Sequence, residues 1–217
     1  SALGISSLSV DLAMPTLVPA VIATLDLSNS ATVELRQALD RKDIAAVSAL
    51  SDVLGENGTV LLTALLQATG PSEQALAALT KLQLPSAAAA ELAALARVAK
   101  ATRAGAPDLT LTIDPVERRG FEYHNGVTFT FFAGGVRGEL GSGGRYMAGR
   151  HKDNGGEPAT GMTLFMDTVL RAMPKPEPQP RLYLPPGTPL VEGIRLRGEG
   201  YITVTGFTET SNTAVEA

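Results

Sequence analysis

Two short segments of the sequence gather residue types that can bind a small polar ligand. Residues 117–126 contain Arg119, Tyr123 and His124, and residues 141–146 form a glycine-rich run that ends in a tyrosine. Glycine allows a ligand to approach the backbone closely. An arginine can hold a carboxylate, and tyrosine and histidine side chains can contact a ring. The two segments therefore predict a pocket for a small zwitterion.

Other kinds of site fit the sequence less well. His124 and His151 are the only histidines and there is no cysteine, so no spacing typical of a metal site is present. The run 141–144 is not followed by Gly-Lys-Ser/Thr, so it does not match a phosphate-binding loop. Neither a nucleophile elbow nor a Ser/His/Asp order is recognisable. We therefore expect a binding pocket without a metal.

A β-hairpin is predicted to carry the two segments to one edge of a sheet. Residues 126–133 alternate in polarity, with a valine and two phenylalanines on one face, which is typical of a strand. We expect the chain to turn at Gly134-Gly135 and to return along Val136 to Leu140. Two more strands are predicted, over residues 108–113 and 158–166, the second running into a helix.

Helices are predicted for most of the first hundred residues. Apolar residues recur at helical spacing in several segments within 17–66, and Pro71 suits the start of another helix. Ser86 is predicted to cap an alanine-rich helix that extends to about Ala101. Helices before and around an antiparallel sheet indicate an α+β fold.

A proline-rich linker at residues 174–180 is predicted to divide the chain. We expect residues 1–173 to form one core, mostly helical over 1–106 and built of strands plus a helix over 107–173. Residues 181–217 are expected to start a small C-terminal segment, with two strands around a short helix or turn.

Composition limits the classes of partner. The net charge is −4, whereas a broad nucleic-acid-binding surface is basic, so the charge argues against tRNA binding. The apolar runs are broken well short of the roughly 20 residues that a membrane span needs. A hydrophobic content of 44% suits a globular protein with a core. We expect a cytoplasmic protein that does not enter membranes.

Three motifs, in order, resemble those of histidyl-tRNA synthetases. Residues 119–124 read Arg-Gly-Phe-Glu-Tyr-His, which is similar to the Arg-Gly-Leu-Asp-Tyr-Tyr histidine-recognition motif of that family. Residues 143–146 resemble its Gly-Gly-Arg-Tyr-Asp signature, and residues 158–170 lie where the third class II synthetase motif belongs. The resemblance implies the later half of a class II synthetase core. It assigns histidine binding to Arg119, Glu122, Tyr123, His124, Gly143, Gly144 and Tyr146.

The residues that hold ATP in the synthetases are replaced in this sequence. Thr168 stands where the family has an arginine on the ATP phosphates, and Phe165 and Met147 replace a glycine and an aspartate. Threonine cannot replace a guanidinium that neutralises phosphate charge. Arg171, one helical turn further along, is a poor substitute, and Phe165 is expected to fill part of the ATP cleft. Such a protein resembles the regulatory subunits of ATP phosphoribosyltransferase.

That second resemblance implies a non-catalytic protein in the first step of histidine biosynthesis. It implies a short-form ATP phosphoribosyltransferase catalytic subunit as partner, self-association, and histidine as an effector. It implies no catalytic residue, no metal and no cofactor. Two alternatives stay open on the sequence: a divergent histidyl-tRNA synthetase, and a synthetase-like scaffold that binds no ligand. We expect the first two class II motifs to lie before residue 1.

Overall fold

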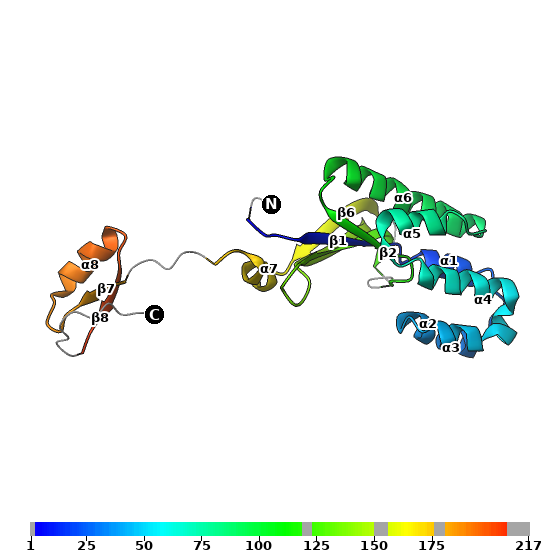
Figure 1. The fold of residues 1–217 in the computed structure, drawn as a ribbon, viewed down its shortest axis with the longest axis horizontal. Coiled ribbons are helices and arrows are strands. Elements are labelled where there is room, and N and C mark those ends of the chain that lie inside the picture. Colours follow the sequence, from blue (N-terminus) through cyan, green and yellow to red (C-terminus); the bar gives the residue numbers. More distant parts are fainter. Residues whose placement is uncertain (1–2, 119–122, 150–155, 176–180, 208–217) are drawn as a thin grey trace. The chain divides into compact units, whose positions relative to one another are not determined.

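The computed structural model describes residues 3–118, 123–149, 156–175 and 181–207. The chain divides into two compact units, Ser1–Pro174 and Lys175–Ala217. The first unit contains a sheet with helices, and the second contains a smaller sheet with one helix (Figure 1).

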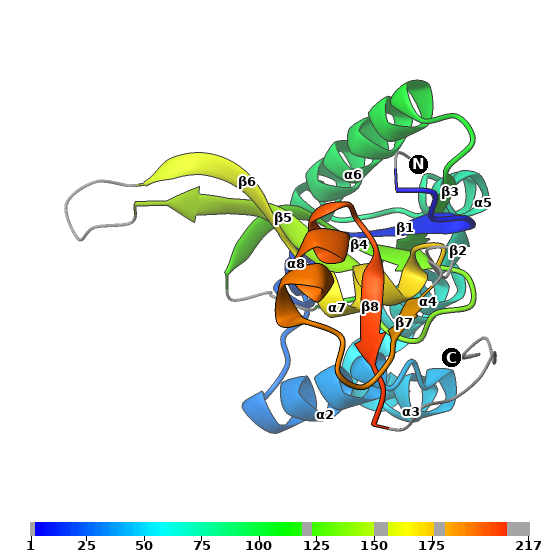
Figure 2. The same cartoon turned by 90° about the vertical axis from the view of Figure 1, so that its left-hand side faces the viewer.

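A six-stranded sheet forms the first unit's framework. Its strands are β1 Leu8–Ala13, β2 Gly70–Pro71, β3 Thr110–Asp114, β4 His124–Ala133, β5 Gly141–Ala148 and β6 Glu157–Leu164. They lie in the order β2, β3, β1, β4, β5, β6, and neighbours are antiparallel except for the parallel pair β1 and β3. Figure 2 shows β5 and β6 running side by side as a long ribbon. The predicted α+β fold with a largely antiparallel sheet is confirmed.

The helices between β1 and β3 pack on one another, and the last two also pack against the sheet. They are α1 Leu17–Ile22, α2 Asn29–Asp40, α3 Ile44–Ala49, α4 Ser51–Gln67, α5 Ser72–Leu79 and α6 Ser86–Gly105. α6 packs on β1 and β4, and Leu95 of α6 belongs to the same buried cluster as Val10 and Leu12 of β1. Phe129 and Phe131 of β4 pack against that cluster, as their predicted common face requires. Side chains at alternate positions therefore point to the opposite face.

Local capping explains where some of these helices begin. Ser28 and Asp43 cap α2 and α3, each accepting a hydrogen bond from the backbone N–H three residues further on, at 3.2 Å and 2.9 Å. The prediction that Ser86 caps the alanine-rich helix is wrong. Ser86 is the first helical residue, and Pro85 precedes it at the cap position without a side-chain hydrogen bond. Alanine's high helix propensity stabilises α6 without that cap.

β1 lies within residues 1–106, which were predicted to be mostly helical and for which no strand was predicted. Val10 and Leu12 point into the core, while Ser9 and Asp11 alternate with them. This alternation with a period of two is the signal of a strand. β1 pairs with β3 on one side and β4 on the other, so it joins the helical half of the sequence to the hairpin.

The loop of the hairpin is longer than predicted. Val136 to Leu140 is not the return strand: β5 begins at Gly141, which pairs with Phe131 of β4. Gly135 and Gly138 adopt positive φ angles of 77° and 103°, which break an extended strand between them. As a consequence, the glycine-rich run 141–144 is itself the return strand.

The third motif region forms β6 and the helix α7 Met166–Ala172, as predicted. Val169 of α7 packs with Ala133 and Leu140 in a second, smaller apolar cluster. In the second unit, the predicted strands are present as β7 Arg181–Leu184 and β8 Ile202–Thr205, which pair in parallel on either side of α8 Leu190–Gly198 in the sequence. None of the described helices is long and apolar enough to cross a membrane.

Candidate functional site

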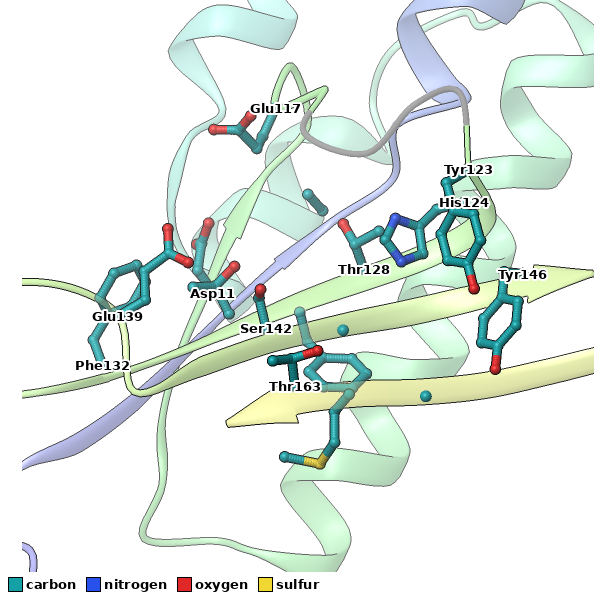
Figure 3. Close-up of a pocket in the computed structure, with 16 residues that line it drawn as sticks. Asp11, Glu117, Tyr123, His124, Thr128, Phe132, Glu139, Ser142, Tyr146 and Thr163 are labelled. Carbon is teal, nitrogen blue, oxygen red and sulfur yellow. The ribbon is translucent and has the colours of Figure 1, made fainter. Parts of the chain in front are cut away.

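A pocket of about 500 Å³ lies on the sheet face opposite α6 (Figure 3). Asp11 of β1 and Thr128 and Thr130 of β4 line it, because they alternate with the core-facing side chains of the same strands. Ser142 of β5 and Thr163 of β6 continue the polar floor on the next two strands. Four adjacent strands therefore build one wall.

Three rings gather at one end of the pocket: Tyr123, His124 and Tyr146 (Figure 3). Tyr123 stacks on Tyr146 with ring centroids 4.8 Å apart, and it meets His124 edge-on at 5.1 Å. His124 and Tyr146 are paired across β4 and β5, so the hairpin brings them together. The buried Nδ1 atom of His124 has no hydrogen-bond partner among the described residues. The tyrosine pair at this end can contact a planar ligand.

Glycines beneath these rings make the aromatic end possible. A Cβ atom on Gly144 would lie 2.7 Å from Cδ2 of His124, and one on Gly161 would lie 3.1 Å from Cε1 of Tyr146. A Cβ atom on Gly143 would lie 2.2 Å from the carbonyl oxygen of Gly161 on β6. The glycine run thus gives room to neighbouring rings and backbone. Gly143 also lines the pocket, whereas the space above Gly144 is taken by His124.

Carboxylates line the other end: Asp11, Glu117 and Glu139 (Figure 3). Burial raises the pKa of the Asp11 carboxyl, and the nearby charges of Asp114 and Glu117 raise it further. A hydrogen bond of 2.5 Å from the Thr112 hydroxyl to Asp11 acts in the opposite direction. The described lining contains no lysine or arginine. This end therefore favours an ammonium group over a polyphosphate.

The acidic end does not have the form of a metal centre. No group of three or more His, Cys, Asp or Glu side chains able to hold a metal ion occurs in the described parts of the chain. The three carboxylates of the pocket come from β1, from the segment after β3 and from the hairpin loop. Their common property is that all three side chains line one cavity.

Two ion pairs join the helical layer to the pocket wall that follows β3. Lys42, between α2 and α3, pairs with Asp114, whose side chain is only 6% exposed. Arg118 Nε lies 3.6 Å from Asp40 Oδ1 at the end of α2. Glu117 lies between the two anchored residues, so the corner between α2 and α3 fixes the segment that presents Glu117 to the pocket.

The structure brings together four of the residues assigned to histidine binding, since Tyr123, His124, Gly143 and Tyr146 all line the pocket. Gly144 lies directly under His124. Arg119 and Glu122 lie outside the described residues. Most of the polar lining was not predicted, because its residues come together only through strand pairing and the hairpin loop: Asp11, Thr128, Thr130, Glu139, Ser142 and Thr163.

α7 contributes no charge to the pocket. The side chain of Thr168 is buried, and its hydroxyl accepts a hydrogen bond of 3.0 Å from Arg171. Arg171 also lies 3.5 Å from the Asp167 carboxylate. Neither Thr168 nor Arg171 lines the pocket, and Phe165, which was expected to fill part of an ATP cleft, lies outside it as well.

Comparison with known proteins places these features in a family. The family model described as histidyl-tRNA synthetase matches residues 1–169. The ATP phosphoribosyltransferase regulatory subunit of Paramagnetospirillum magneticum is 51% identical over 215 residues, which are 99% of this chain and 54% of that protein. That of Rhodospirillum centenum is 49% identical over 217 residues, which are 100% of this chain and 54% of that protein. The chain spans about half the length of these relatives.

Solved structures show the same fold. The crystal structure of an ATP phosphoribosyltransferase regulatory subunit/histidyl-tRNA synthetase from Bacillus halodurans has a TM-score of 0.68 at 22% identity, over 93% of this chain and 54% of that one. The ATP phosphoribosyl transferase (HisG:HisZ) complex from Thermotoga maritima has a TM-score of 0.58 at 16% identity, over 73% of this chain and 53% of that one. The chain therefore belongs to the histidyl-tRNA synthetase family, in which these curated relatives are ATP phosphoribosyltransferase regulatory subunits.

Proposed function

We propose that the protein is the regulatory subunit of ATP phosphoribosyltransferase, in the first step of histidine biosynthesis. A short catalytic subunit needs it for activity and for feedback by histidine, and it self-associates within the complex. The observation that carries this proposal is the 51% identity, over 99% of the chain, to a protein of that name. The likeness of the fold to a chain of the HisG:HisZ complex supports the partnership.

The protein does not activate histidine with ATP. Adenylate formation places negative charge on the departing pyrophosphate, and positioned cations stabilise that charge. Three observations support the loss of this chemistry: Thr168 is uncharged and buried, Arg171 is engaged with Asp167, and the described pocket lining is acidic. Like charges would repel a triphosphate from Asp11 and its neighbours. The pocket is then a sensor site without a catalytic residue.

Histidine is the ligand that this pocket suits. The imidazole ring lies against Tyr123 and Tyr146, and the ammonium group faces the carboxylate end near Asp11. Arg119 holds the carboxylate, with Glu122 beside it, as the family resemblance implies. Gly143 forms part of the pocket floor, and Gly144 leaves room for the ring of His124 beside the ligand. The separation of an aromatic end from an acidic end supports a ligand that is planar at one end and cationic at the other.

Two assays on the full-length protein test the function. The first mixes it with a short ATP phosphoribosyltransferase catalytic subunit and measures phosphoribosyl transfer with and without histidine. The second measures histidine-dependent exchange of labelled pyrophosphate into ATP. We expect activation that histidine suppresses, and no exchange above background. Exchange without activation would instead identify a divergent synthetase, and absence of both, with no calorimetric histidine binding, would identify a scaffold that binds no ligand.

A further inference from the structure

A second cavity, of about 580 Å³, lies on the other face of the sheet, between α6 and strands β4 and β5. One side of α6 lines it at helical spacing, through Glu91, Ala94, Val98 and Ala101. Val127 and Phe129 of β4 and Met14 add apolar wall. The cavity therefore lies on the opposite face of the sheet from the front pocket, although Phe129 of β4 is part of both linings.

Two arginines reach this cavity from different elements, Arg97 from α6 and Arg145 from β5. Both are exposed, and within the described chain neither has an ion-pair or hydrogen-bond partner. The stem of Arg145 lies close over Gly126, where a Cβ atom would come within 3.1 Å of both its Cβ and Cδ atoms. Glu91 is the single carboxylate in the described lining. The cavity thus carries a net positive charge.

The motif Gly-Gly-Arg-Tyr consequently serves two faces of the sheet. Tyr146 points to the front pocket, where it stacks with Tyr123. Arg145, its neighbour on β5, points to the back cavity because successive side chains of a strand alternate. The proposed histidine site accounts for Tyr146 and leaves Arg145 without a role.

We propose that the back cavity binds a small organic anion, made of an oxyanion group on an apolar or aromatic body. Guanidinium groups hold carboxylate and phosphate oxygens through paired N–H donors. The apolar wall formed by Val98, Val127 and Phe129 receives the body of the ligand. A phosphate monoester and a carboxylate share this chemistry. The opposite signs of charge keep the ligands of the two faces apart: the front takes a cationic group and the back takes an anion.

Calorimetric titration of the full-length protein with phenyl phosphate, benzoate and phenol tests this site. We expect at least one anion to bind, and phenol, which lacks an oxyanion at neutral pH, to bind at least about tenfold more weakly. Arg97→Met and Arg145→Met keep an unbranched apolar stem and remove the charge, and each should weaken anion binding about tenfold. Arg41→Met alters an exposed arginine at the end of α2, outside the cavity, and should change nothing.

A further variant keeps both arginines in place. Ala101→Glu adds a carboxylate at an exposed lining position and should also weaken anion binding. Ala101→Glu therefore still tests the anion site if an arginine variant fails to fold. Tighter binding of phenyl phosphate assigns the site to phosphate esters, and tighter binding of benzoate assigns it to carboxylates. The proposal fails if neither anion binds, if phenol binds as tightly as they do, or if the charge variants bind like the wild type.

Discussion

The imidazole of His124 lies over Gly144, so closely that a Cβ atom at residue 144 would come within 2.7 Å of Cδ2 of the ring. The same Cβ atom would lie 2.8 Å from Cγ2 of Thr128, which is paired with Gly144 across β4 and β5. Because residue 144 is enclosed from both sides, the absence of its side chain sets the position of the histidine ring. The glycine therefore affects the candidate site through the position of His124.

Gly144→Ala should push His124 and Thr128 off their positions. Overpacking of this kind costs about 1–3 kcal/mol of unfolding free energy, and we expect histidine affinity to fall as well, because the aromatic cluster is displaced. Gly105→Ala is the matched control, since nothing lies within 4 Å of a Cβ atom there. Thermal unfolding and calorimetry measure the two effects. A Gly144→Ala protein with wild-type stability and affinity would show that His124 has free space elsewhere.

Asp11→Asn should stabilise the protein at neutral pH and should lower its affinity for histidine. The pKa of Asp11 is raised above its ordinary value of 3.8 in the folded protein. The folded protein therefore binds the carboxyl proton of Asp11 more tightly than the unfolded chain does. The penalty for ionised Asp11 is absent below pH 3.8 and grows as the pH rises through the folded pKa. Asparagine keeps an oxygen that accepts the hydrogen bond from Thr112.

Denaturant unfolding from pH 3.5 to pH 8 tests this linkage. The stability gain of Asp11→Asn should be near zero at the acidic end and should increase toward neutrality, and calorimetry should show weaker binding of histidine at pH 7. Asp108→Asn, at an exposed position before β3, serves as control. A stability gain that is constant with pH would rule out the proton linkage. Unchanged histidine affinity would mean that the ammonium group of histidine does not bind at Asp11.

Lys42→Ala should destabilise the fold, because it leaves the buried carboxylate of Asp114 without its cation. Lys42 is itself 45% exposed, so we expect a loss of about 1–3 kcal/mol, below that of a fully buried pair. Lys42 also has a positive φ of 54°, which glycine adopts more readily. Lys42→Gly should therefore be less destabilising than Lys42→Ala. The reverse order in urea unfolding would mean that the backbone at residue 42 is not strained.

The sequence predicted the elements with local signals and missed those that depend on distant pairing. The alternation in 126–133 identified β4 and its core face, because Phe129 and Phe131 show the period directly. The same period in Ser9 to Leu12 is short and is followed at once by α1, so β1 was taken with the helices. The return strand was misplaced because turn signals at Gly134 and Gly135 continue through a second left-handed glycine, Gly138.

The candidate site divides in a similar way. Its aromatic end lies on one hairpin, and a motif that is contiguous in the sequence therefore identified Tyr123, His124 and Tyr146. Its acidic end needs Asp11, which reaches the pocket only because β1 inserts between β3 and β4. No local sequence pattern indicates that β1 lies between β3 and β4. The position of Asp11 in the pocket thus follows from sheet order, and single segments of the sequence do not predict it.

Restoring an arginine at position 168 should not restore a synthetase. Thr168 is only 5% exposed, so the larger side chain of Thr168→Arg must displace the residues packed around it. We expect a stability loss of about 1–3 kcal/mol from overpacking and no histidine-dependent pyrophosphate exchange. Thr168→Val, which loses only the hydroxyl contact with Arg171, should cost under about 1.5 kcal/mol.

The comparison of these two variants separates crowding from chemistry. A single cation at residue 168 would also lie outside the pocket, because Thr168 is not part of its described lining. Electrostatic stabilisation of a transition state requires donors aimed at the developing charge in a prepared site, which one added arginine does not create. Exchange by Thr168→Arg clearly above the wild-type background would overturn this view. It would mean that the ATP site is intact apart from one residue, and that the regulatory role arose by a single loss.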